Sequence, residues 1–97
     1  CLSVPAFAQF DAEAAENVFK ENDCHKCHHA TKAKKGPALK KIAAKYKEKK
    51  LGEKDAIKQM TTAPKVKLED GTEENHKDIE TRDPKELSNL AQWILSQ

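Results

Sequence analysis

The chain has little apolar material, few aromatic side chains and no long hydrophobic run. Because no stretch of about 18 apolar residues occurs, the sequence contains no segment that could span a membrane. Of its 97 residues, 37% are hydrophobic and only 5% are aromatic. Such a length suits one domain, and a domain of this size buries a small fraction of its surface. We therefore expect a single domain that a metal, a disulfide or a cofactor completes.

Positive and negative charges are concentrated in separate stretches, although the net charge is only +2. Residues 26–58 contain twelve lysines and three acidic residues, whereas residues 69–86 contain eight acidic residues and three basic ones. The basic stretch has one aromatic residue, Tyr46, and no known nucleic-acid-binding module, which argues against a nucleic-acid partner. Its lysines either steer an acidic protein toward the chain or form an ordinary solvated surface.

The first eight residues differ from the rest, because they are uncharged and mostly apolar. They end in Ala6-Phe7-Ala8, the small-x-small pattern of a signal-peptidase site. We interpret residues 1–8 as the remnant of an export signal and residues 9–97 as the mature domain. Cys1 would then belong to the apolar part of the signal. An ordinary N-terminal segment is the alternative.

Apolar residues recur at helical spacing in four segments, which predicts helices within residues 10–22, 36–50, 52–64 and 83–97. Pro37 is expected in the first turn of the second helix. In the last helix, Asp83 is the expected N-cap, and Glu86 would complete a capping box. No segment alternates convincingly as a strand, so residues 64–82 are expected to be a long loop without regular structure. The predicted fold class is all-α, with about four helices.

Residues 24–28 read Cys-His-Lys-Cys-His, the CXXCH pattern of c-type haem attachment. Two thiols at this spacing add to the two vinyl groups of one haem, and the histidine after the second cysteine is held beside the iron. Cys24 and Cys27 are thus the predicted thioether residues of one covalent haem c, and His28 is the predicted proximal iron ligand. Bacteria attach this haem outside the cytoplasm, which agrees with an export signal and predicts a periplasmic protein.

Two other kinds of site use closely spaced cysteines. A thioredoxin-type dithiol needs a βαβ context, and no strands are predicted. A zinc site needs four ligands, and no second ligand pair with regular spacing follows the cysteines. The residues available to such a zinc site are Cys24, Cys27, His25, His28, His29 and His76.

Three segments, "NVFKENDCHKCH", "KKGPALKKIAAKY" and "LSNLAQWILSQ", make the chain resemble the short class I cytochromes c of bacteria over residues 10–97. The resemblance implies that the first and last helices cross and pack, so that Phe19 meets the 90–94 face of the last helix. It also implies that the carbonyl of Pro37, in the pair Gly36-Pro37, accepts the Nδ1–H of His28 and orients that ligand. The lysine content and the loop histidine are similar to those of periplasmic shuttles of iron-oxidising bacteria, of the MtoD type.

The second iron ligand of this family is usually a methionine in a Met-Pro-Pro stretch, and the chain departs from that pattern. Its single methionine, Met60, has helical spacing with apolar neighbours and is expected in the core. The stretch "DGTEENHKDIETRD" stands in place of the methionine loop and contains His76. We therefore expect His28 and His76 to bind the iron, with a nearby carboxylate accepting the other ring N–H of His76. Met60 as the ligand and an open, weakly held iron are the alternatives.

A covalently held haem with two axial protein ligands has no open position for a substrate. The chain is therefore expected to be a monomeric electron-transfer protein and not an enzyme. A gas-binding or redox-sensing haem protein, in which His76 dissociates, and a zinc-binding structural module are the alternatives. Lysines close to the motif are the candidates for docking an acidic redox partner. These are Lys26, Lys32, Lys34, Lys35, Lys40 and Lys41.

Overall fold

The computed structural model describes residues 10–97, so the interpretation of residues 1–8 as an export signal lies outside the described part. Within residues 10–97 the chain forms four α-helices, one short 3-10 helix and one two-stranded hairpin. The elements are α1 (Ala12–Glu21), η2 (Cys24–Lys26), α2 (Leu39–Glu48), α3 (Glu53–Thr61), β1 (Lys65–Lys67), β2 (Glu73–Asn75) and α4 (Pro84–Leu95). The mainly helical architecture confirms the predicted fold class. None of the helices in this range is long and apolar enough to cross a membrane.

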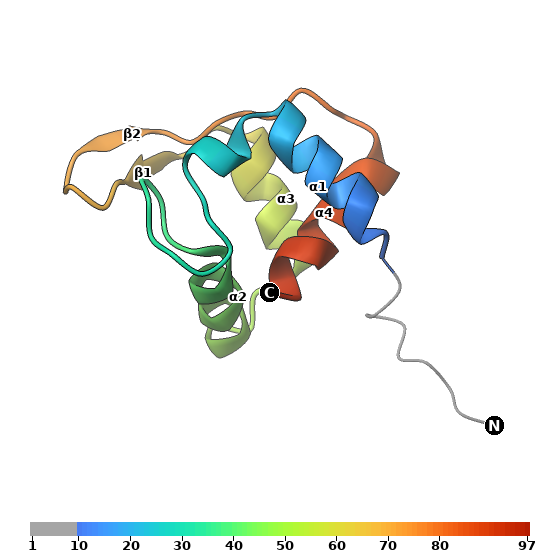
Figure 1. Cartoon of the computed structure of the whole chain (residues 1–97), viewed down its shortest axis with the longest axis horizontal. Coiled ribbons are helices and arrows are strands. Elements are labelled where there is room, and N and C mark those ends of the chain that lie inside the picture. Colours follow the sequence, from blue (N-terminus) through green and yellow to red (C-terminus); the bar gives the residue numbers. More distant parts are fainter. Residues whose placement is uncertain (1–9) are drawn as a thin grey trace.

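Helices α1 and α4 cross and pack directly against each other, although they lie at opposite ends of the described chain (Figure 1). The rings of Phe19 and Trp93 meet edge to face, with their centroids 5.4 Å apart. Ala15, Leu90 and Ala91 are 0% exposed at this crossing. The apolar stripes predicted for the first and last helices thus form the centre of one core, as the family resemblance implied.

Helix α2 begins later than expected. Pro37 lies outside the helix, because Ala38 is still extended, with φ −60° and ψ 146°, and the first helical residue is Leu39. The carbonyl of Pro37 is therefore free to bond a side chain instead of a helical N–H.

At the N-terminus of α4, Thr81 takes part in the capping in addition to Asp83 and Glu86. Asp83 accepts the N–H of Lys85 at 3.0 Å, as an N-cap should. Glu86 does not reach back to the N–H of Asp83; its carboxylate accepts the hydroxyl of Thr81 at 2.7 Å. That hydroxyl accepts the N–H of Asp83 at 3.2 Å. The predicted capping box between Asp83 and Glu86 is therefore not formed directly; the hydroxyl of Thr81 links the two residues.

The prediction that residues 64–82 lack regular structure is wrong. Strands β1 and β2 pair antiparallel, with Lys65 opposite Asn75 and Lys67 opposite Glu73. Gly71 has a φ of +89° in the connecting turn, a conformation that glycine adopts without strain. Most of the paired residues are exposed, so the strands show no apolar alternation in the sequence. The hairpin matters for the site because β2 ends at the residue before His76.

Candidate functional site

The motif at residues 24–28 is held in a tight turn directly after α1. Asp23 has a left-handed backbone, with φ 59°, and η2 follows it. The N–H groups of Cys27 and His28 both donate to the carbonyl of Cys24, at 3.1 and 2.9 Å. The turn brings the two cysteines and the histidine to the wall of the same cavity.

This cavity has a volume of about 450 Å³, which is in the range of cofactor sites. It lies between the motif, α2, the end of α3 and the hairpin. Much of its wall is apolar or aromatic, which suits a flat, mostly apolar group. The apolar and aromatic wall residues beyond the motif are Pro37, Ile42, Tyr46, Leu51, Val66 and Leu68.

His28 is fixed by the backbone that follows the motif. Its Nδ1 lies 2.7 Å from the carbonyl oxygen of Pro37. Because a carbonyl can only accept, Nδ1 carries the hydrogen, and the lone pair of Nε2 is available to a metal. Burial lowers the pKa of His28, since desolvation disfavours the charged imidazolium, and this favours the neutral form that binds metals.

Gly36 makes room for the ring of His28. A Cβ at this position would lie only 2.7 Å from Cε1 of His28, closer than carbon atoms approach without a shift. The N–H of Gly36 also donates to the carbonyl of Cys27 at 2.9 Å. Gly36 therefore leaves space for the imidazole ring, and the carbonyl of Pro37 holds the ring through Nδ1.

His76 follows the hairpin and is held in the same manner. Its own N–H donates to the carbonyl of Pro64 at 2.7 Å. Its Nδ1 lies 2.9 Å from the carbonyl oxygen of Lys77. The expectation of a carboxylate acceptor is thus wrong, because the adjacent backbone carbonyl reaches the ring first. The result for the ring is the same, since Nε2 keeps its lone pair for a metal.

The two imidazoles face each other across the cavity, with ring centroids 6.2 Å apart and planes inclined by 36°. Two imidazoles on opposite sides of one metal ion have centroids about 6 Å apart, because each metal–nitrogen bond is about 2 Å long and each nitrogen lies about 1 Å from its ring centre. The observed separation therefore fits one metal ion between His28 and His76.

Met60 lies elsewhere. It is 6% exposed and belongs to the core cluster that all four α-helices build, while its neighbour Gln59 lines the cavity. This agrees with the expectation that Met60 fills the core.

Cys24 lies in surroundings that suit an uncharged sulfur. Burial raises the pKa of the Cys24 thiol to about 11, which keeps it protonated at neutral pH. Among residues 10–97, no three His, Cys, Asp or Glu side chains are grouped closely enough to hold a metal ion. The four-ligand zinc set considered from the sequence is therefore not assembled in this part of the chain.

The profile of the cytochrome c family matches residues 12–97. The chain belongs to the cytochrome c family. This cytochrome is similar to cytochrome c-552 of Nitrosomonas europaea, with 48% identity over 48 residues, which are 50% of this chain and 43% of that protein. The match thus spans less than half the length of that relative.

The cytochrome is also similar in structure to the class 1 cytochrome MtoD from Sideroxydans lithotrophicus ES-1. The TM-score is 0.83 at 43% sequence identity, and the match covers 90% of this chain and 96% of that one. The protein is thus a small class I cytochrome c, and its cofactor is covalently attached haem c. The apolar cavity and its two facing imidazoles fit that group.

Sequence reasoning found five residues that meet at the cavity: Cys24, Cys27, His28, Pro37 and His76. The polar residues of the cavity wall were not predicted from the sequence. None of the six lysines proposed for docking lines the cavity, although all are exposed. The lysines that do line it come from α2 and the residue that follows it, from β1 and from the position after His76. They are Lys45, Lys49, Lys67 and Lys77.

Proposed function

We propose that this cytochrome carries single electrons on one haem c whose iron is bound by His28 and His76. In this proposal Cys24 and Cys27 form the thioethers. The pair of facing imidazoles carries the proposal, because their centroids are 6.2 Å apart and each Nδ1 is engaged by a backbone carbonyl. Each ring thus offers Nε2, and only Nε2, to the iron.

Haem iron supplies a one-electron couple between its ferric and ferrous states. The protein supplies two neutral imidazoles and holds both in fixed orientations through the carbonyls of Pro37 and Lys77. If His28 and His76 both bound the iron, no position would be left for a substrate, which favours electron transfer over catalysis. An imidazole in place of the usual thioether lowers the reduction potential, so the protein would work among low-potential partners.

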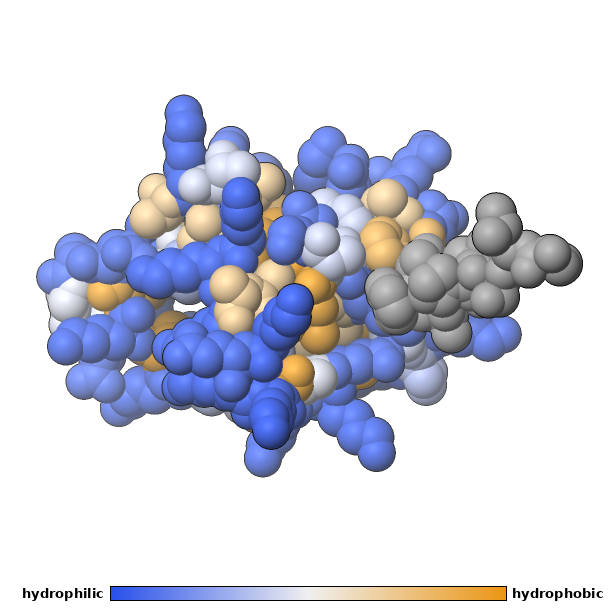
Figure 2. Space-filling view, turned by 90° about the horizontal axis from the view of Figure 1, so that it is seen from below, coloured by the Kyte–Doolittle hydropathy of each residue, from blue (hydrophilic) through white to orange (hydrophobic). Residues whose placement is uncertain are grey.

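The proposed partners are redox proteins with an acidic docking face, and the proposed location is the periplasm. The exposure of all six candidate lysines, Lys26 to Lys41, supports docking through this region. Figure 2 shows one face of the molecule, on which hydrophilic side chains dominate and apolar groups are visible between them. The periplasmic location is supported by the site of haem c attachment in bacteria and by the Ala6-Phe7-Ala8 pattern.

Two substitutions test the ligand set. We expect the ferric protein to be low-spin and to lack the weak sulfur-to-iron band at the red edge of the visible spectrum. His76→Ala should make the iron high-spin and let the ferrous form bind CO. Met60→Leu should leave the low-spin spectrum intact and cost less than about 1.5 kcal/mol of stability, because the volume is conserved. A low-spin His76→Ala variant together with a high-spin Met60→Leu variant would establish a His/Met cytochrome instead.

A further inference from the structure

The segment that carries His76 is tied to the rest of the molecule on both sides of that residue. On one side, the N–H of His76 donates to the carbonyl of Pro64 at 2.7 Å. On the other side, the N–H of Ile79 donates to the carbonyl of Met60 at 2.9 Å, and Ile79 is only 1% exposed. Both of these ties lead to α3 or to the turn that follows it.

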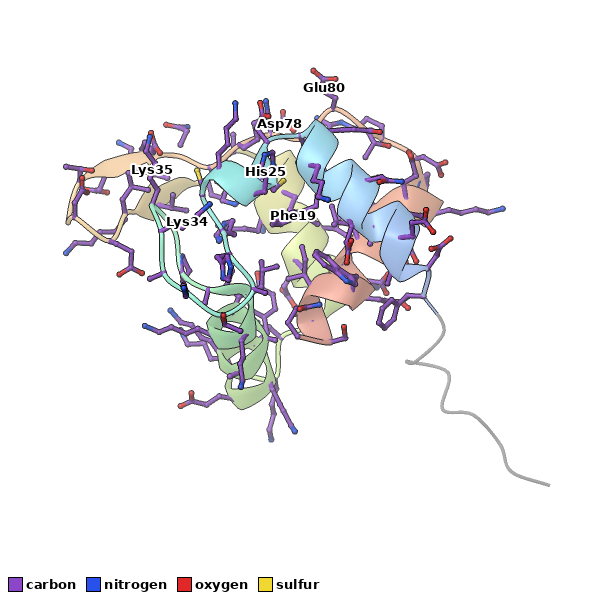
Figure 3. All side chains as sticks on the ribbon, viewed as in Figure 1. Phe19, His25, Lys34, Lys35, Asp78 and Glu80 are labelled. Carbon is purple, nitrogen blue, oxygen red and sulfur yellow. The ribbon has the colours of Figure 1, made fainter. Side chains whose placement is uncertain are left out.

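A third tie leads to α1 instead, and it is made by a buried side chain. Asn22 is the C-cap residue of α1 and is 7% exposed; within residues 10–97 no other polar residue is buried to this extent. Its Nδ2 donates to the carbonyl of Val18 at 2.9 Å. Its Oδ1 accepts the backbone N–H of Glu80, also at 2.9 Å, across 58 positions of sequence. Glu80 extends its own side chain away from the molecule, so the tie is to its backbone (Figure 3).

We propose that Asn22 is a positioning residue that keeps His76 on the iron, by fixing the backbone at Glu80 to the end of α1. The inference rests on the proposed ligation by His28 and His76. The end of α1 is also where the Cys24 turn begins, so one amide holds the His76 segment to the stretch that carries His28.

Exposed contacts cannot replace this tie. Arg82 reaches Asp78 at 2.8 Å, but both side chains are about half exposed, at 57% and 47%. Such surface pairs contribute little. The bond from Asn22 to Val18 is buried and the bond from Glu80 to Asn22 is part-buried. Loss of the amide would leave the N–H of Glu80 without its partner, whereas the carbonyl of Val18 would still accept the backbone N–H of Asn22 at 3.1 Å.

The test is the rate at which cyanide replaces His76 on the ferric holoprotein. Asn22→Ala should leave the resting spectrum low-spin but speed cyanide binding by about tenfold, the factor that corresponds to one lost hydrogen bond. Asn89→Ala is the matched control. The Oδ1 of Asn89 accepts the N–H of Asp11 at 2.7 Å and its Nδ2 donates to the carbonyl of Asp11 at 2.8 Å, at the opposite end of α1. It should lower the melting temperature and keep the wild-type cyanide rate.

An unchanged cyanide rate in Asn22→Ala, or equal acceleration in both variants, would overturn the proposal. Amide hydrogen exchange of the wild type gives a second measurement that needs no variant. The N–H of Glu80 should be protected as well as that of Ile79, and an unprotected Glu80 would also refute the role of Asn22. A His76→Ala variant that stays low-spin would instead refute the ligand assignment, so the two failures are distinguishable.

Discussion

At the scale of single residues, the ring of His28 leaves no room for a side chain at residue 36. A Cβ on residue 36 would lie 2.7 Å from Cε1 and 3.1 Å from Nδ1 of His28. The ring cannot turn away freely, because its Nδ1–H is bonded to Pro37. We predict that Gly36→Ala lowers the free energy of unfolding of the holoprotein by about 1–3 kcal/mol, as overpacking does. It should also perturb the absorption bands of the haem.

Gly52→Ala is the matched control for this prediction. A Cβ at residue 52 would meet nothing within 4 Å. Because Gly52 is the N-cap of α3, the change should cost less than about 1 kcal/mol. Denaturant unfolding followed by the Soret band measures both variants. Equal losses, or an unchanged haem spectrum in Gly36→Ala, would contradict the account of Gly36 as the residue that makes room for the ligand.

At the scale of elements, the crossing of α1 and α4 carries the core. Phe19 is 7% exposed and meets the ring of Trp93 at 5.4 Å. We predict that Phe19→Ala destabilises the holoprotein by about 3–5 kcal/mol, the range for a buried aromatic residue. Phe10, just before α1, is only partly buried, so Phe10→Ala should cost clearly less. Similar losses in the two variants, measured by urea denaturation, would show that the crossing does not depend on this aromatic pair.

The helices could be predicted and the hairpin could not, for a physical reason. Each helix buries one apolar stripe, and that stripe is visible as spacing in the sequence. The hairpin has polar strands, Lys65–Lys67 and Glu73–Asn75, which lie mostly exposed and need no apolar alternation. The cap of α4 shows the same limit. The spacing of Asp83 and Glu86 predicted a direct hydrogen bond between them, but each of them bonds to the hydroxyl of Thr81 instead.

At the scale of the whole molecule, the site combines local and long-range information. Cys24, Cys27 and His28 are adjacent, so the motif alone indicated them. His76 was predicted only after Met60 had been assigned to the core, because the position of His76 relative to His28 depends on how the hairpin ends. Asn22 gave no signal, since its role depends on a contact 58 positions away. The cavity wall also could not be predicted from the sequence, because six separate stretches of the chain build it.

The separation of positive and negative charge along the chain is also a property of the whole molecule. Residues 26–58 carry twelve lysines and three acidic residues. We predict that electron exchange with an acidic redox protein slows when salt is raised from about 10 mM to 1 M, because the screening length falls from about 30 to 3 Å. Stopped-flow kinetics measure this rate. A rate that does not respond to salt would leave the lysines without a steering role.

The lysines can be tested in pairs of equal charge. Changing Lys40 and Lys41 to Gln should weaken the salt dependence of the rate, because both lie close to the haem motif in sequence and are exposed. Changing Lys65 and Lys85 to Gln removes the same charge from β1 and α4 and is the control. Equal effects of the two double substitutions would indicate a response to net charge and not to a docking region.

The paired hydrogen bonds between Asp11 and Asn89 join positions that are 78 residues apart. Closing a loop of this length costs conformational entropy, which the packing of α1 against α4 must offset. The apolar stripe of α1 is therefore buried only once residues 84–95 have folded against it. Before that, Cys24 and Cys27 lie in an open chain, in which the enzymes that attach haem can reach both thiols.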